Sequence, residues 1–158
     1  MSTIPLTIKG AEKLKEELHR LKTIERHAVI QAIAEARAQG DLSENAEYDA
    51  AKDKQAFVEG RILELESKLA VAQVIDPTNV DAGGRVVFGA TVDLEEEATG
   101  YQVTYQIVGD DEADLKLGLI SISSPISRAL IGKEAGDNVQ YQAPGGIKKY
   151  EILDVRYI

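Results

Sequence analysis

The sequence predicts an α+β protein of two domains, an antiparallel coiled-coil hairpin followed by an antiparallel sheet with a short helix. Three observations support this prediction. Residues 9–74 contain no proline, and their apolar residues recur at the three- and four-residue spacing of a helix. Asp76-Pro77 interrupts that pattern, and the alternation typical of strands follows it. We therefore expect the hairpin in residues 1–75 and the sheet domain in residues 76–158.

The hairpin is predicted from two apolar stripes separated by a short break. In the first arm the stripe consists of Leu14, Leu18, Leu21, Ala28 and Ala32. In the second arm it consists of Tyr48, Ala51, Val58, Ile62, Leu65, Leu69 and Ala72. Two such stripes favour an antiparallel coiled coil, and arms of about 28 residues extend about 40 Å at 1.5 Å per residue. Gly60 lies inside the second arm, where we expect close packing of the two helices.

The second half has the alternating pattern and the turn clusters of a small antiparallel sheet. Strands are expected at residues 85–94, 101–108, 139–142 and 149–157. A short helix at residues 127–131 is expected after Ser124-Pro125. Strands with one helix packed on them indicate an α+β domain.

Composition and charge exclude several classes of function for this protein. The net charge is −9, of which −2 falls in residues 1–75 and −7 in residues 76–158. A protein that grips nucleic acid through its phosphates presents a basic face, so we expect no direct binding to free DNA. The absence of cysteine excludes disulfides and thiolate metal sites. Because no segment resembles a signal peptide or a membrane span, we expect a cytoplasmic protein without a membrane partner.

The break between the arms, residues 40–48, is the most informative segment. Gly40 can end the first helix, because glycine adopts the left-handed conformation without steric cost. Asp41 followed by Glu44 fits a capping box for the next helix, which is the purely structural interpretation. We expect the remaining residues of this segment to support the tip, namely Gly40, Ser43, Asn45, Glu47 and Tyr48.

A functional interpretation of the same segment starts from its acidic residues, which are more than one helix cap requires. Asp41 and Glu44 are hard oxygen ligands for a divalent cation, but two carboxylates alone hold Mg²⁺ weakly. Arg37 and Lys52 lie one to two turns away, where they can meet a phosphate beside such a metal. The hairpin would then complete the two-metal centre of a partner and orient a water at a phosphodiester. By itself the protein would be no enzyme.

The run GDLSENAEY at residues 40–48 resembles the Gre transcript-cleavage factors of bacteria, closest to the GreA branch. The resemblance continues through FVEGRI at residues 57–62, GRVVFGATV at residues 84–92 and IVGDDEAD at residues 107–114. It covers essentially the whole chain in the order of the family. The tip run is its most specific part.

The resemblance implies a transcription elongation factor that acts on bacterial RNA polymerase. Its hairpin would enter the secondary channel and stimulate magnesium-dependent cleavage of backtracked nascent RNA near the 3′ end, rescuing arrested complexes. The acidic pair of the family falls on Asp41 and Glu44, which would share Mg²⁺ with the polymerase. Arg37 matches a basic tip residue that contacts RNA, and Lys52 stands where close relatives often have arginine.

The resemblance also implies a role for the second domain. This domain would be FKBP-like and would dock at the rim of the polymerase channel. The loop that falls on the docking surface contains Ser121, Ser124 and Pro125. DNA would be approached only through the polymerase complex.

Two other functions compete with this one. A relative that occupies the same channel could inhibit the polymerase, although the intact acidic pair argues against that function. The second half could alternatively be a prolyl isomerase carried on a coiled coil. That activity usually needs an aromatic-lined pocket, and residues 76–158 contain no tryptophan and a single phenylalanine, Phe88.

Overall fold

The computed structural model describes residues 3–40 and 45–158. The chain divides into two compact units. Residues 11–72 form the hairpin unit, and residues 3–10 with residues 73–158 form the sheet unit. The sheet unit thus includes the N-terminal strand β1 (Ile4–Thr7), which pairs with β2 (Ala72–Ile75). The predicted α+β class is confirmed.

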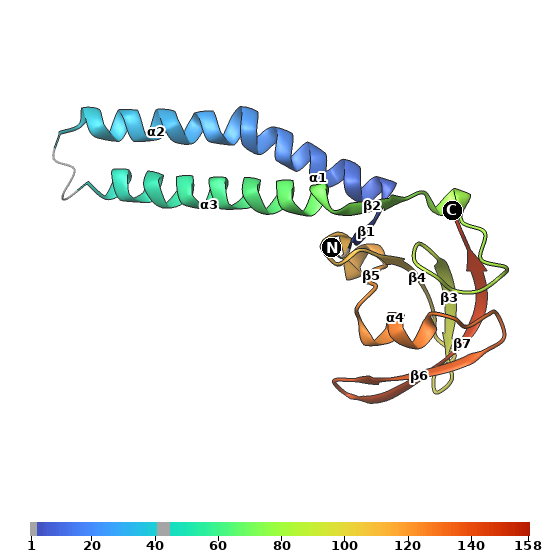
Figure 1. Cartoon of the computed structure of the whole chain (residues 1–158). Helices are drawn as coiled ribbons and strands as arrows, with labels where there is room; N and C mark the ends of the chain where they lie inside the picture. The colour runs from blue at the N-terminus through green and yellow to red at the C-terminus, as the bar shows by residue number, and fades with distance from the viewer. Residues whose placement is uncertain (1–2, 41–44) are drawn as a thin grey trace. The chain divides into compact units, whose positions relative to one another are not determined.

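The hairpin contains α1 (Ile8–Arg20), the π-helical turn η1 (Leu21–Glu25), α2 (Arg26–Ala38) and α3 (Ala46–Ala70). α2 and α3 lie side by side and run in opposite directions (Figure 1). The buried apolar residues of the hairpin are Ala11, Leu14, Leu21, Val29, Ile33 and Ala36 in the first arm and Ala51, Val58, Ile62 and Leu65 in the second. The predicted stripe of the second arm is therefore confirmed at its central positions.

The predicted stripe of the first arm is wrong beyond Leu21. Ala28 and Ala32 are exposed, and the residues that follow them, Val29 and Ile33, are buried instead. In η1 the N–H of Arg26 donates to the carbonyl of Leu21, five residues earlier. Such a turn holds one residue more than an α-helical turn, so every later core position moves by one.

Ion pairs across the two arms reinforce this packing. Arg61 forms a bidentate ion pair with Glu17, with N···O distances of 2.8 and 3.1 Å. Arg26 pairs with Glu59 in the same way, at 2.9 Å for both bonds. At Gly60, by contrast, a Cβ atom would meet nothing within 4 Å. The close helix packing expected at Gly60 is therefore wrong.

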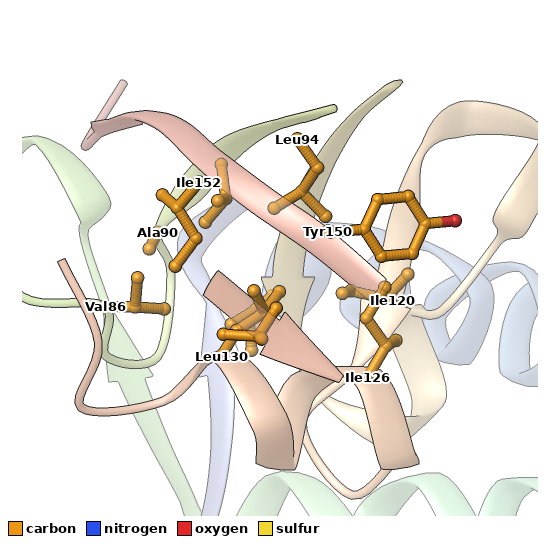
Figure 2. Close-up of a cluster of buried hydrophobic side chains, with 11 residues drawn as sticks. Val86, Ala90, Leu94, Ile120, Ile126, Leu130, Tyr150 and Ile152 are labelled. Atoms are coloured by element: carbon orange, nitrogen blue, oxygen red, sulfur yellow. The ribbon is translucent and has the colours of Figure 1, made fainter. Parts of the chain in front are cut away.

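The sheet unit is built on five strands in the order β5-β4-β3-β7-β6. They are β3 (Thr91–Glu96), β4 (Gln102–Val108), β5 (Leu119–Ser121), β6 (Asn138–Ala143) and β7 (Gly146–Arg156). The helix α4 (Pro125–Leu130) adds Ile126 and Leu130 to the buried cluster, opposite sheet residues such as Leu94 and Ile152 (Figure 2). Most pairs are antiparallel as predicted, but β5 runs parallel to β4.

Local hydrogen bonds explain where the observed elements differ from the predicted ones. The strand expected from residue 85 begins only at Thr91, because Val86 bonds to the loop after α4 through Lys133 and Gly132, both at 2.8 Å. The helix expected to reach residue 74 ends at Ala70, and β2 follows it. No helix within the described ranges is long and apolar enough to cross a membrane.

Candidate functional site

The tip of the hairpin begins where α2 ends. Gly40 has a φ of +106°, and its N–H donates to the carbonyl of Arg37 at 3.2 Å. A side chain at this φ would strain the backbone, so the predicted helix stop at Gly40 is confirmed. The chain therefore leaves α2 directly after the turn that contains Arg37.

Asn45 joins the two helix ends. Its Oδ1 accepts the N–H of Tyr48 at 3.0 Å, which caps the first turn of α3. Its Nδ2 donates to the carbonyl of Ala36 at 2.8 Å, in the last turn of α2. One amide thus satisfies a free donor at the start of one helix and adds a second donor to the Ala36 carbonyl, which also accepts the N–H of Gln39 at 3.2 Å.

A second link lies beside Asn45. Gln39 Nε2 donates to Glu47 Oε2 at 2.9 Å and ties the C-cap of α2 to the first turn of α3. Tyr48, predicted at a core position, is half-buried. Asn45, Glu47 and Tyr48 are thus brought together at the base of the tip.

The residue that caps α3 is not the one that the local sequence pattern suggested. The helix begins at Ala46 with Asn45 as its N-cap, so the capping box expected at Asp41 and Glu44 is wrong as the start of α3. Asp41, Ser43 and Glu44 lie outside the described residues. Within the ranges that the structure describes, no group of three or more potential ligands is placed to hold a metal ion.

Arg37 and Lys52 lie on the same groove. This shallow groove has a volume of about 450 Å³ and is lined by Ile30, Ile33, Ala34, Arg37, Lys52 and Gln55. Lys52 Nζ donates to Gln55 Oε1 at 3.2 Å. Arg37 is exposed, and no described carboxylate pairs with its guanidinium. The structure therefore brings the two predicted RNA-contacting cations to one face, close to the tip.

Farther from the tip, charged side chains of the two arms pair with each other; we call this part of the hairpin, with the pairs Arg26–Glu59 and Arg61–Glu17, the shaft. The Arg26 guanidinium donates to the Glu59 carboxylate and lowers the pKa of Glu59 below its ordinary value. The same hydrogen bonds raise the pKa of Arg26. Charges along the shaft therefore stabilise each other, whereas Arg37 points its charge at solvent.

The predicted docking residues lie together in the sheet unit. Ser121 ends β5, and Ser124 caps α4 by accepting the N–H of Ser127 at 3.3 Å. Pro125, at the first position of α4, is exposed. Sequence reasoning missed Asp110, whose carboxylate accepts the hydroxyls of Ser121 and Ser123. No local sequence pattern indicates this contact, because it depends on the parallel pairing of β4 and β5.

An acidic-tipped hairpin joined to a small α+β sheet unit defines the class of protein. The family model described as "Transcription elongation factor, N-terminal" matches residues 4–74, and "Transcription elongation factor, GreA/GreB, C-term" matches residues 81–157. The chain is 73% identical over 157 residues to transcription elongation factor GreA of Verminephrobacter eiseniae, covering 99% of each chain. It is 68% identical over 158 residues to the GreA of Polaromonas naphthalenivorans, covering all of both.

The chain therefore belongs to the GreA/GreB family of transcription elongation factors. It is also similar to the crystal structure of GreA factor homolog 1 of Thermus thermophilus, at 27% identity, with 98% and 99% of the two chains covered and a TM-score of 0.44. A TM-score below 0.5 adds nothing to the family assignment.

Proposed function

We propose that this protein enters the secondary channel of RNA polymerase with its hairpin tip and stimulates cleavage of backtracked nascent RNA at the 3′ end. The family is one of transcription elongation factors, accessory proteins of RNA polymerase. The observation that supports the mechanism is the cap of α3. Because Asn45 supplies that cap, the local structural explanation for Asp41 and Glu44 as helix starters loses its basis.

The two carboxylates are better suited to a magnesium ion that the polymerase also binds than to one that this protein binds alone. Asp41 and Glu44 are oxygen donors of the kind Mg²⁺ prefers, but two such groups leave most of the coordination shell to water. The polymerase would therefore supply the remaining ligands, and the free protein would have no activity of its own. When bound, the ion would lower the pKa of a water and stabilise charge on the phosphodiester.

The residues of this chain have separate tasks in the proposed reaction. Asp41 and Glu44 would help to hold the shared ion and would orient the attacking water. Arg37 and Lys52, on their common groove, offer positive charge to the RNA phosphates. Lysine at position 52 acts as a point charge and lacks the planar fork of arginine.

The sheet unit would dock at the rim of the channel through Ser121, Ser124 and Pro125. Contact with DNA would then occur only through the polymerase complex, in the cytoplasm. An inhibitor that merely occupies the channel is the alternative, and relatives named as elongation factors over the full chain do not favour it.

A transcript-cleavage assay on a stalled, backtracked elongation complex tests the proposal. The intact protein should release a 3′ RNA fragment in a Mg²⁺-dependent reaction. An inhibitor would slow transcription without releasing a fragment. Calorimetric titration of the isolated protein with Mg²⁺ should show no site tighter than about millimolar. A tight site in the free protein would contradict the shared-ion mechanism.

A further inference from the structure

The loop after β5 is held by one carboxylate oxygen. Ser121 and Ser123 both donate their hydroxyls to Oδ1 of Asp110, the latter at 2.7 Å. The N–H of Ser123 donates to Ser121 Oγ at 3.1 Å, so the hydroxyls and the backbone of the loop form one network. Asp110 thereby fixes the loop directly before the cap of α4, Ser124.

Asp110 is itself on a rigid support. It begins the short 3₁₀ turn Asp110–Glu112, whose N-cap Gly109 directly follows the end of β4. Glu112 Oε2 accepts the N–H of Gly109 at 2.7 Å and the N–H of Thr7 at 3.0 Å. A Cβ atom at Gly109 would lie 2.5 Å from the carbonyl oxygen of Pro5. The backbone that presents the Asp110 carboxylate is therefore tightly packed.

The pairing of β4 with β5 brings the carboxylate and the loop together. Val108 is the register partner of Ser121, and the N–H of Ile122 donates to the Val108 carbonyl at 2.8 Å. The end of β4 and the start of the loop thus lie next to each other. The hydroxyls of Ser121 and Ser123, on either side of Ile122, reach Asp110 from this loop.

We propose that Asp110 is a positioning residue of the docking surface: it holds the loop Ser121–Pro125 in the conformation that binds the partner. This inference rests on the proposed function, because it takes this loop as the docking surface. Asp110 does not need to touch the polymerase. It reduces the conformational freedom that the loop would otherwise lose on binding, and preorganisation of this kind increases affinity.

Replacement of Asp110 tests the inference through affinity rather than maximal rate. With Asp110→Ala, the factor concentration that half-saturates transcript cleavage should rise about tenfold. The maximal cleavage rate at saturation should stay unchanged, since the tip is intact. Asp110→Asn should restore most of the affinity, because both serines donate to one oxygen and an amide oxygen accepts as well.

Asp81→Ala is the matched control for charge. Asp81 is exposed, lies in the same unit and makes no side-chain hydrogen bond or ion pair within the described residues. Its replacement removes the same charge and should leave half-saturation unchanged. If Asp110→Ala fails to fold, Ser123→Ala removes one of the two hydroxyl donors at a residue outside the three that are predicted to dock. It should also raise the half-saturating concentration, by a smaller factor, because Ser121 still donates to Asp110.

Three results would overturn the inference. One is an unchanged half-saturating concentration for Asp110→Ala or, where that variant does not fold, for Ser123→Ala. Another is an equal loss for Asp110→Asn, which would make charge, and not position, the cause. The third is a fall in maximal rate without a change in half-saturation.

A Pro125→Glu variant shows whether the positioning role of Asp110 is wrong or whether the loop is not the docking surface at all. Pro125 is exposed at the start of α4, where an acidic residue suits the helix dipole. If Pro125→Glu weakens binding and Asp110→Ala does not, the loop docks and the positioning role is wrong. If neither weakens binding, the loop is not the docking surface and the positioning role falls with it.

Discussion

The shaft and the tip of the hairpin use their charges in opposite ways. Along the shaft, Arg61 pairs with Glu17 and Arg26 pairs with Glu59, each through two hydrogen bonds across the arms. Near the tip, Arg37 has no carboxylate partner among the described residues, and the helix cap is supplied by a neutral amide, Asn45. The difference indicates that shaft charges stabilise the hairpin, whereas tip charges are available to a partner.

The largest effect is expected from a deletion that changes which residues of the first arm face the core of the hairpin. Deleting Gln31 would rotate the residues beyond it by one position and remove Ile33 and Ala36 from the core. We expect a loss of at least about 3 kcal/mol in the unfolding free energy of the hairpin. Urea unfolding followed by circular dichroism measures it.

Deleting Thr23 is the matched control. Thr23 lies inside η1, whose extra residue the deletion would remove, leaving an ordinary α-helical turn. The core positions beyond it keep their phase, so the loss should stay below about 1 kcal/mol. Equal losses for the two deletions would show that the π-turn does not set the phase of the arm.

Asn45 gives the next largest effect. Asn45→Ala removes the cap of α3 and the side-chain donor to the Ala36 carbonyl, which keeps only the N–H of Gln39, at a cost of about 1–2 kcal/mol. Asn45→Ser keeps a capping oxygen and loses the bond to the Ala36 carbonyl, so it should cost less. Hydrogen exchange at the Tyr48 amide reports the cap directly. Exchange as slow in Asn45→Ala as in the parent protein would contradict the assigned cap.

The smallest effect is the pH dependence of the shaft pair. The pKa of Glu59 is lowered in the folded protein, chiefly by the hydrogen bond from Arg26. The unfolded chain therefore binds this proton first as pH falls, so the stabilisation is present above pH 4.5, the ordinary pKa of glutamate, and is lost below it. Glu59→Gln should flatten the fall in hairpin stability between neutral pH and pH 3. An unchanged slope would show that this pair contributes nothing measurable.

The sequence predicted the elements well where local pattern decides them. The second-arm stripe at Val58, Ile62 and Leu65 is buried as expected, and Gly40 ends α2. Both follow from spacing and from backbone geometry, which neighbouring residues determine. The first-arm stripe fails beyond Leu21, because a π-turn is a choice between two local hydrogen-bond patterns that apolar spacing alone does not distinguish.

The site shows the same division. Asp41 and Asn45 are both good N-cap residues a few positions apart, and only the observed start of α3 at Ala46 selects Asn45. Asp110 acts across 11 and 13 residues on Ser121 and Ser123, through a parallel pairing that the strand pattern did not predict. Contacts set by tertiary pairing therefore escape a local interpretation of the sequence.

The central claim is that the tip carboxylates serve the partner and not the fold. Cleavage of backtracked RNA by Asp41→Asn and Glu44→Gln variants, at saturating factor, tests it most directly, with Asp53→Asn as an exposed control on α3. We expect each tip variant to lose about 100-fold or more in cleavage rate while still competing with the parent protein for the polymerase, and the control to keep full activity. Full cleavage by both tip variants would contradict the account.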